Sequence, residues 1–245
     1  MKIEIYQPQA IWELGQRNNQ EDSIFPAFGE ATDDDRLFIL CDGMGGHEHG
    51  EVASQTVCKA MSDTLLSLSK QSFTDDDLLD ALQTAYRQLD CLDNSHLRKM
   101  GTTLCLLYFH QGGLTAAHIG DSRIYHIRPK ENRILYQSRD HSLVYDLYQA
   151  GEISYEEMRT SLQKNIITRA IQPGEESRVR PAIVHIADIQ PGDYFYICSD
   201  GMLEQMDNDE LCRLLSADGS DEKKRKQLVA ATSDNKDNHW PISST

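Results

Sequence analysis

Residues 37–50 read Leu37-Phe38-Ile39-Leu40-Cys41-Asp42-Gly43-Met44-Gly45-Gly46-His47-Glu48-His49-Gly50. The apolar run 37–41 predicts a buried strand, and the glycines that follow predict a turn in which side chains would obstruct the backbone. Such a strand delivers the carboxylate of Asp42 to the rim of a sheet. Three more aspartates occur downstream in comparable settings, at Asp121, Asp200 and Asp237. Four carboxylates at the ends of elements predict a site for several metal ions.

The settings of these aspartates favour that interpretation over a simple turn. Asp200 follows the apolar run 194–199 and, like Asp42, precedes a glycine. Asp121 stands in Ile119-Gly120-Asp121-Ser122-Arg123, and Asp237 lies just before a short final strand. A single Asp-Gly is typical of a turn, but two apolar strands that both end in Asp-Gly are harder to explain that way. Mg²⁺ and Mn²⁺ prefer carboxylate, carbonyl and water oxygens, and they would offset the repulsion between the carboxylates.

Composition limits the class of protein. The chain has 245 residues with 39% hydrophobic content, which is enough for one domain over 1–245. Its formal net charge of −15 argues against a nucleic-acid partner, because phosphate-backbone binding needs clustered Lys and Arg. The one basic run, Lys223-Lys224-Arg225-Lys226, is predicted to be a solvated helix face.

The cysteines and apolar segments indicate the compartment. None of the six cysteines forms a Cys-x-x-Cys pair, and several lie in apolar strands, where a free thiol acts as a small hydrophobe. No apolar stretch has the length of a signal peptide core or the roughly 18 residues of a membrane span. The sequence therefore predicts a soluble, cytoplasmic protein with reduced cysteines and no membrane partner.

The apolar periodicity predicts an α+β fold with antiparallel sheets, not the alternating βαβ of a parallel sheet. Helices are expected at 51–68, from a cap at Thr74 or Asp75 onward, twice within 141–162, and at 207–216 and 221–232. Strands are expected at 2–6, 10–15, 37–41, 102–109, 114–119, 123–128, 179–187, 193–199 and 239–243.

An arginine stands close to two carboxylates in Gly15-Gln16-Arg17-Asn18-Asn19-Gln20-Glu21-Asp22. One interpretation of Arg17 is a surface ion pair. The other is a guanidinium fork that grips phosphate oxygens bidentately. In the second case Glu21 and Asp22 would orient metal-bound waters.

The order of these motifs resembles that of the metal-dependent serine/threonine protein phosphatases of the 2C type, and the Met-Gly-Gly-His version is similar to the bacterial branch. The resemblance spans roughly residues 10–240. The matching pieces are 17–22, Asp42-Gly43-Met44-Gly45-Gly46-His47, Gly101-Thr102-Thr103, 117–123, Arg139-Asp140-His141-Ser142-Leu143, 165–170, Gly192-Asp193, Ser199-Asp200-Gly201-Met202 and Asp237-Asn238.

The resemblance implies a four-layer αββα sandwich, in which two antiparallel β-sheets are flanked by helices. It implies that Asp42 bridges two Mn²⁺ or Mg²⁺ ions, with the Gly43 carbonyl and water held near Glu21 and Asp22 completing one of them. Asp200 and Asp237 would bind the other ion, and Asp121 with Asp200 a third, weaker one. The segment at about 141–165 corresponds to the family's flap, which contacts substrate.

The expected chemistry is hydrolysis of a phosphate monoester by a metal-activated water, which attacks phosphorus in line. Arg17 would stabilise charge on the equatorial oxygens. No cysteine or serine nucleophile is required, so Cys41 and Cys198 are interpreted as strand packing.

The sequence departs from the family's pattern in three places. Gln20 stands where asparagine is usual, and Met44 stands where animal members carry a histidine proposed to protonate the leaving oxygen. His47 is the candidate general acid here, with His49 or a metal-bound water as alternatives. Asp234 and Asp237 both precede an asparagine, and Asp237 is favoured because its pair lies just before the final strand.

The leading hypothesis is a monomeric phosphatase that acts on phosphoserine and phosphothreonine in proteins, in signalling opposite a cognate Ser/Thr kinase. One alternative is a catalytically weak member that serves as a regulator or binding module. Another is a hydrolase of small phosphoesters on the same fold. A nucleotide-binding loop at Gly43–Gly46 is a poor interpretation, because no Gly-Lys-Ser/Thr follows.

Overall fold

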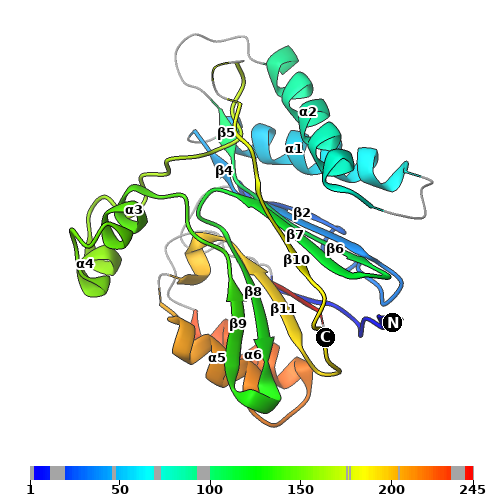
Figure 1. The fold of residues 1–245 in the computed structure, drawn as a ribbon, viewed down its shortest axis with the longest axis vertical. Helices are drawn as coiled ribbons and strands as arrows, with labels where there is room; N and C mark the ends of the chain where they lie inside the picture. The colour runs from blue at the N-terminus through cyan, green and yellow to red at the C-terminus, as the bar shows by residue number, and fades with distance from the viewer. Residues whose placement is uncertain are drawn as a thin grey trace.

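Two antiparallel sheets form the centre of the molecule (Figure 1). The computed structural model describes residues 3–11, 20–45, 48–68, 73–92, 100–174, 176, 178–203, 205–232 and 241–244. Sheet I has the strand order β10-β7-β6-β3-β2, and sheet II has the order β1-β12-β11-β8-β9. A further pair, β4 with β5, extends from the end of β3.

The strands have these bounds: β1 Gln9–Ala10, β2 Ser23–Phe25, β3 Leu37–Cys41, β4 Gly43–Met44, β5 Gly101–Thr102, β6 Leu104–His110, β7 Gly113–Ile119, β8 Arg123–Arg128, β9 Arg133–Gln137, β10 Ala182–Ile186, β11 Tyr194–Cys198 and β12 Pro241–Ser244. The helices are α1 Glu48–Leu66, α2 Asp75–Leu92, α3 Leu143–Gln149, α4 Tyr155–Thr160, α5 Asn208–Ser216 and α6 Asp221–Ala231.

Alternation along the strands produces the layers. In β3, Ile39 belongs to a core shared with α1 and α2, while its neighbours Phe38 and Leu40 face a core between the two sheets. In β11, Tyr196 packs in a third core with residues of α5 and α6. The three cores separate four layers, and they confirm the expected αββα sandwich of antiparallel sheets flanked by helices. The pair α3–α4 forms a lobe beside the sandwich (Figure 1).

Several predicted elements agree closely with the structure. Thr74 caps α2, since its hydroxyl accepts from the Asp77 amide at 3.4 Å while the Asp77 carboxylate accepts from the Thr74 amide at 3.0 Å. The two short helices within 141–162 are α3 and α4, which begin after the serine caps Ser142 and Ser154.

The ends of the chain differ from the prediction. The expected strand 2–6 is wrong for residues 3–6, which form no strand, although Ile5 still packs between the sheets. The expected strand 10–15 contributes only Ala10 to β1, and its residues 12–15 lie outside the described part of the chain. The final strand starts at Pro241, where a missing N–H is tolerated, and it is interior, between β1 and β11.

The basic run 223–226 is not uniformly solvated, so that prediction is wrong for Lys224. This side chain is buried, and its Nζ donates to the Leu215 carbonyl at 2.7 Å and to the Tyr194 hydroxyl at 3.0 Å. The aliphatic stem can lie in the core because the ammonium finds partners there. Among the described residues, no helix is long and apolar enough to cross a membrane.

Candidate active site

Asp42 lies at the end of β3, where its backbone is fixed from both sides. Its amide donates to the Thr103 hydroxyl at 3.0 Å. Its carbonyl accepts from the Thr103 amide at 2.9 Å and from the Thr102 hydroxyl at 2.8 Å. Because three hydrogen bonds hold one residue, the strand cannot shift register without moving the 102–103 segment.

Gly43 is required by close packing. A Cβ placed on it would lie 2.2 Å from the carbonyl oxygen of Gly50 in α1 and 2.6 Å from that of Glu21. The Gly43 amide also donates to the Glu21 carbonyl at 3.2 Å. The structure therefore brings Glu21 and the start of α1 against the turn that follows Asp42.

Asp121 follows β7 and is nearly buried, with 6% of its surface exposed. Its Oδ1 has no hydrogen-bond partner among the described residues, which is uncommon for a buried polar atom. Burial, followed by the negative charges of Asp200 and Asp140, raises the pKa of Asp121 well above its usual range. An oxygen without a donor, flanked by two carboxylates, is an arrangement that suits a bound cation.

Hydroxyl groups join the strand ends that carry these aspartates. Thr103, which holds Asp42, also shares a hydrogen bond of 2.8 Å with the Ser122 hydroxyl, next to Asp121. Ser199, next to Asp200, donates from its hydroxyl to Asp22 Oδ2 at 3.0 Å. These bonds connect sheet I with sheet II at one end of the sandwich, so the predicted ligands come from both sheets to one region.

An ion pair that the sequence analysis did not assign lies beside Asp121. Arg123 donates to both carboxylate oxygens of Asp140, at 2.7 and 2.6 Å, and from its third nitrogen to the Tyr125 hydroxyl at 3.1 Å. Both residues belong to motifs quoted above, Gly120-Asp121-Ser122-Arg123 and Arg139-Asp140-His141, so the motif order was the signal that could have pointed to them.

A cavity of about 370 Å³ opens between these aspartates and the α3–α4 lobe. Asp121, Asp140 and Asp200 line it on the side of the sandwich, and Tyr155 and Arg159 line it on the side of α4. Arg159 also reaches Asp207, the cap of α5, with an Nη1–Oδ2 distance of 3.6 Å. The lobe thus forms one wall of a cleft whose opposite wall is acidic.

Two histidines stack at the base of this lobe. The rings of His118 and His141 are 4.8 Å apart, and His141 Nδ1 accepts from the Gly120 amide at 3.1 Å. His118 Nε2 donates to the Arg139 carbonyl at 2.7 Å. Burial, followed by the neighbouring His118, lowers the pKa of His141 to about 4. His141 is therefore neutral at physiological pH and serves as an acceptor.

The cysteines near the site pack in the strands, as expected. Cys41 and Cys198 are fully buried free thiols. Burial raises the pKa of Cys41 well above its usual range and that of Cys198 to about 12. Neither residue supplies a thiolate nucleophile near neutral pH.

Three predicted site residues, Arg17, His47 and Asp237, lie outside the described residues. Within the described ranges, no group of three or more His, Cys, Asp or Glu side chains forms a metal site by itself. The structure brings Asp22, Asp42, Asp121 and Asp200 to one end of the sandwich, and it places Glu21 and Gly43 beside Asp42.

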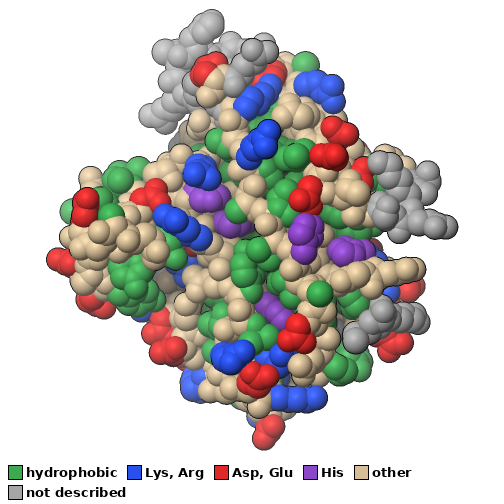
Figure 2. Space-filling model, in the orientation of Figure 1, with side chains coloured by type: hydrophobic (Ala, Val, Ile, Leu, Met, Phe, Trp, Pro, Cys, Tyr) green, Lys and Arg blue, Asp and Glu red, His purple; other side chains and the backbone are tan. Residues whose placement is uncertain are grey.

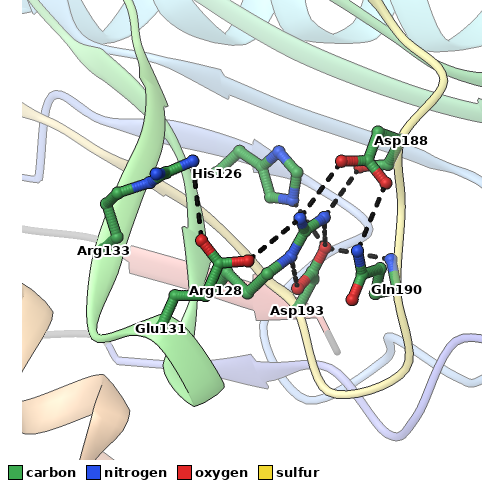
Figure 3. Close-up of polar contacts among 7 residues, drawn as sticks. All are labelled: His126, Arg128, Glu131, Arg133, Asp188, Gln190 and Asp193. Carbon is green, nitrogen blue, oxygen red and sulfur yellow. Dashed lines mark hydrogen bonds and ion pairs between the residues drawn. The ribbon is translucent and has the colours of Figure 1, made fainter.

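A second cluster of charged residues, centred on the buried Asp193, lies at the other end of β8 (Figure 3). Asp193 accepts from Arg128 Nε and Nη2, both at 2.9 Å, from His126 Nε2 at 2.8 Å, and from the Gln190 amide at 3.0 Å. Arg128 also donates to Asp188 Oδ2 at 3.1 Å. Every charge in this cluster has a partner, so it stabilises the turn between β10 and β11.

The comparisons with known proteins agree with this site. The family model described as "Protein phosphatase 2C" matches residues 15–231. A putative protein phosphatase 2C-type of Streptococcus pyogenes is 35% identical over 199 residues, covering 79% of this chain and 78% of that protein. The serine/threonine phosphatase stp of Listeria monocytogenes is 33% identical over 196 residues, covering 77% and 75%.

Solved structures are similar over nearly the whole chain. Serine/threonine phosphatase Stp1 from Staphylococcus aureus has a TM-score of 0.84 at 30% identity, covering 98% of this chain and 94% of that one. The catalytic domain of the serine/threonine protein phosphatase PstP, in complex with 2 manganese ions, has a TM-score of 0.78 at 26% identity, covering 99% and 98%.

Proposed function

This chain belongs to the protein phosphatase 2C family and is a metal-dependent serine/threonine protein phosphatase, and from that premise we propose that the reaction takes place where Asp42, Asp121 and Asp200 lie. The observation that carries the proposal is the buried Oδ1 of Asp121, which has no donor among the described residues and lies beside two more carboxylates. A cation satisfies such an oxygen, and a hydrogen bond from the described residues does not.

The proposed ligands follow the sequence motifs. Asp42, the Gly43 carbonyl, Glu21, Asp200 and Asp237 would hold two core ions, Mn²⁺ or Mg²⁺, with Asp22 acting through water. Asp121 with Asp200 would hold a third, weaker ion. When bound, the ions act as Lewis acids that lower the pKa of water and polarise the phosphoryl oxygens.

The protein's own groups position the reactants. Thr102 and Thr103 fix the backbone of Asp42, from which its carboxylate would reach the ions. Arg17 binds the phosphoryl oxygens through its guanidinium fork. His47 donates a proton to the leaving oxygen of serine or threonine, as the candidate general acid.

The wider setting follows from the same residues. We propose a monomer with a single catalytic domain over 1–245 and a flap at about 141–165, in which one chain supplies every ligand. Its substrates are phosphoproteins made by a cognate Ser/Thr kinase, and it acts in the cytoplasm. The cleft between α4 and the aspartates supports the flap assignment, because substrate bound there would touch both walls.

A phosphate-release assay tests the proposal. Purified protein with Mn²⁺ is expected to hydrolyse p-nitrophenyl phosphate and a phosphothreonine peptide, and chelator is expected to abolish both activities. Asp42→Asn should lower kcat by at least about a hundredfold, because it removes a charge that holds the ions. Asp63→Asn, which removes an exposed carboxylate from α1, is the matched control and should retain full activity.

The outcomes separate the alternatives. An Asp42→Asn variant with full activity would contradict the site. Rapid turnover of free nucleotides or sugar phosphates without peptide turnover would identify a small-phosphoester hydrolase. Metal binding without any turnover would identify a regulator.

A further inference from the structure

Apolar side chains are exposed on the α3–α4 lobe. Eight large apolar side chains are exposed among the described residues, and three of them lie between 155 and 166. Leu162 is 103% exposed, Ile166 45% and Tyr155 44%. Figure 2 shows hydrophobic side chains gathered on this lobe. Large apolar side chains exposed together beside a cleft are typical of a recognition site.

The backbone that carries Leu162 and Ile166 is held in place. The Lys164 amide donates to the Ser161 carbonyl at 3.3 Å, and the Ile166 amide donates to the Gln163 carbonyl at 3.0 Å. The Ile166 carbonyl accepts from the Leu143 amide at 2.9 Å, which fastens the turn to the start of α3. The two side chains are therefore presented to solvent from an ordered turn, and a partner need not order that backbone on binding.

This apolar surface is continuous with the candidate active site. Tyr155 lines the 370 Å³ cleft that contains Asp121 and Asp200. Leu162 lies between Thr160 and Lys164 in sequence, and both of these neighbours line the same cleft. A polypeptide whose phosphoresidue lies at the aspartates and whose flanking residues run along the lobe wall would meet this surface.

The charges at the rim fit a phosphorylated peptide. The chain as a whole carries −15, yet the lobe side of the cleft carries two cations, Arg159 and Lys164, against one carboxylate, Glu156. Cations at the mouth favour an anionic substrate. Leu162 and Ile166 offer no polar partner, so the side chain that they contact best is apolar, because a charged one would lose its hydration without compensation.

We propose that Leu162, Ile166 and Tyr155, the apolar rim, recognise an apolar side chain of the phosphoprotein substrate close to the phosphoresidue. The inference rests on the proposed function and adds a substrate preference to it: phosphoserine or phosphothreonine with a large aliphatic or aromatic residue nearby. The rim selects the substrate and takes no part in the chemical step.

A peptide series tests the preference. Each phosphothreonine peptide carries one leucine at a different position among the three on either side of the phosphothreonine, with serine elsewhere. The wild type is expected to prefer at least one leucine peptide over the all-serine peptide by about fivefold to tenfold in kcat/KM, the size expected from partial burial of one leucine.

Variants connect that preference to the rim. Leu162→Ser is expected to remove most of the preference, measured as the ratio of kcat/KM for the leucine and all-serine peptides. Leu66→Ser alters an exposed leucine at the end of α1, away from the cleft lining, and should keep the preference. Circular dichroism checks that both variants fold, which is expected because both side chains are exposed.

The results distinguish the two proposals. Equal turnover of all peptides, or a preference that Leu162→Ser retains, overturns the apolar rim and leaves the phosphatase reaction intact. Turnover of p-nitrophenyl phosphate without turnover of any peptide overturns both. Sedimentation of the wild type as a dimer that Leu162→Ser converts to a monomer would show that a second copy covers the rim, and would also overturn the proposal.

Discussion

Asp193 and Asp121 are both buried aspartates, and they lie toward opposite ends of β8 in very different surroundings. Asp193 receives hydrogen bonds from His126, Arg128 and the Gln190 amide. Burial alone would raise the pKa of Asp193, but these donors outweigh it and lower the pKa. Asp121 has an oxygen with no donor among the described residues, and burial together with Asp200 and Asp140 raises its pKa.

The difference shows how a buried carboxylate that stabilises the fold can be distinguished from one that binds a ligand. A buried carboxylate whose charge is balanced by the protein contributes to stability and needs nothing more. A buried carboxylate whose neighbours are also carboxylates weakens the fold until a cation arrives. The cluster around Asp193 has its charges balanced by the protein itself, whereas the carboxylates around Asp121 are arranged to bind a cation.

The largest expected effect comes from breaking the complete cluster. Asp193→Asn should lower the free energy of unfolding by about 3 kcal/mol, because Arg128 loses its buried charge partner and keeps only the more exposed Asp188 and Glu131. Urea unfolding measures this. The exposed pair Lys59–Asp63 is the control, and Asp63→Asn should change stability by less than about 0.5 kcal/mol. A loss of phosphatase kcat by folded Asp193→Asn would contradict the separation of the two clusters.

The histidines sharpen the comparison by pH. Burial lowers the pKa of both rings; Asp193 opposes that shift at His126, whereas His118 adds to it at His141, whose pKa falls to about 4. A folded-state pKa below that of the unfolded chain means that the unfolded chain binds more protons between about pH 4 and 6.5, so stability is present at neutral pH and falls as pH falls.

The matching measurement compares the wild type with His141→Gln, which keeps an acceptor and cannot titrate. Between pH 7 and pH 5 the wild type should lose about 2 kcal/mol more in free energy of unfolding than the variant. His118, Arg139, Asp146 and Arg169 also act on this ring, and they are unchanged in the variant. If the free energy of unfolding changed with pH in the same way for the two proteins, His141 would not titrate as described.

The smallest effect has the opposite sign to the first. Asp121→Asn should raise the stability of the metal-free protein by about 1 kcal/mol, because it removes a buried negative charge next to Asp200 and Asp140. Added Mn²⁺ should then stabilise the variant less than the wild type. Thermal unfolding in chelator measures the stability of the metal-free variant, and unfolding in Mn²⁺ measures the stabilisation by metal. If the variant were less stable than the wild type in chelator, Asp121 would stabilise the metal-free fold, as Asp193 does.

Much of this arrangement could be predicted from sequence. Strands β3 and β11 consist of apolar and aromatic residues, and β7 is mostly apolar. Each ends near an aspartate, so the sequence predicted both the strands and the rim positions of Asp42, Asp121 and Asp200. The resemblance to a known family supplied the packing of two sheets between helices, because periodicity alone does not show how the layers are arranged.

The remainder depended on tertiary contacts. Strand β9 was not predicted, since Arg133 and Gln137 at its ends interrupt the apolar pattern and its pairing with β8 contains an irregular register. The burial of Lys224 requires acceptors from β11 and α5, which no local window contains. The Arg123–Asp140 pair joins residues 17 positions apart, so both motifs could be identified in the sequence but the contact between them could not be predicted.

The position of β12 has a consequence for synthesis of the protein. Residues 241–244 lie between β1 and β11, so sheet II contains a strand from the start of the described chain, one from its end, and three from the middle. The chain is synthesised from its amino end, so β1 has no β12 to pair with until more than two hundred further residues have been made. Until β12 emerges, β11 presents an open edge, which is the kind of surface that nascent-chain chaperones shield.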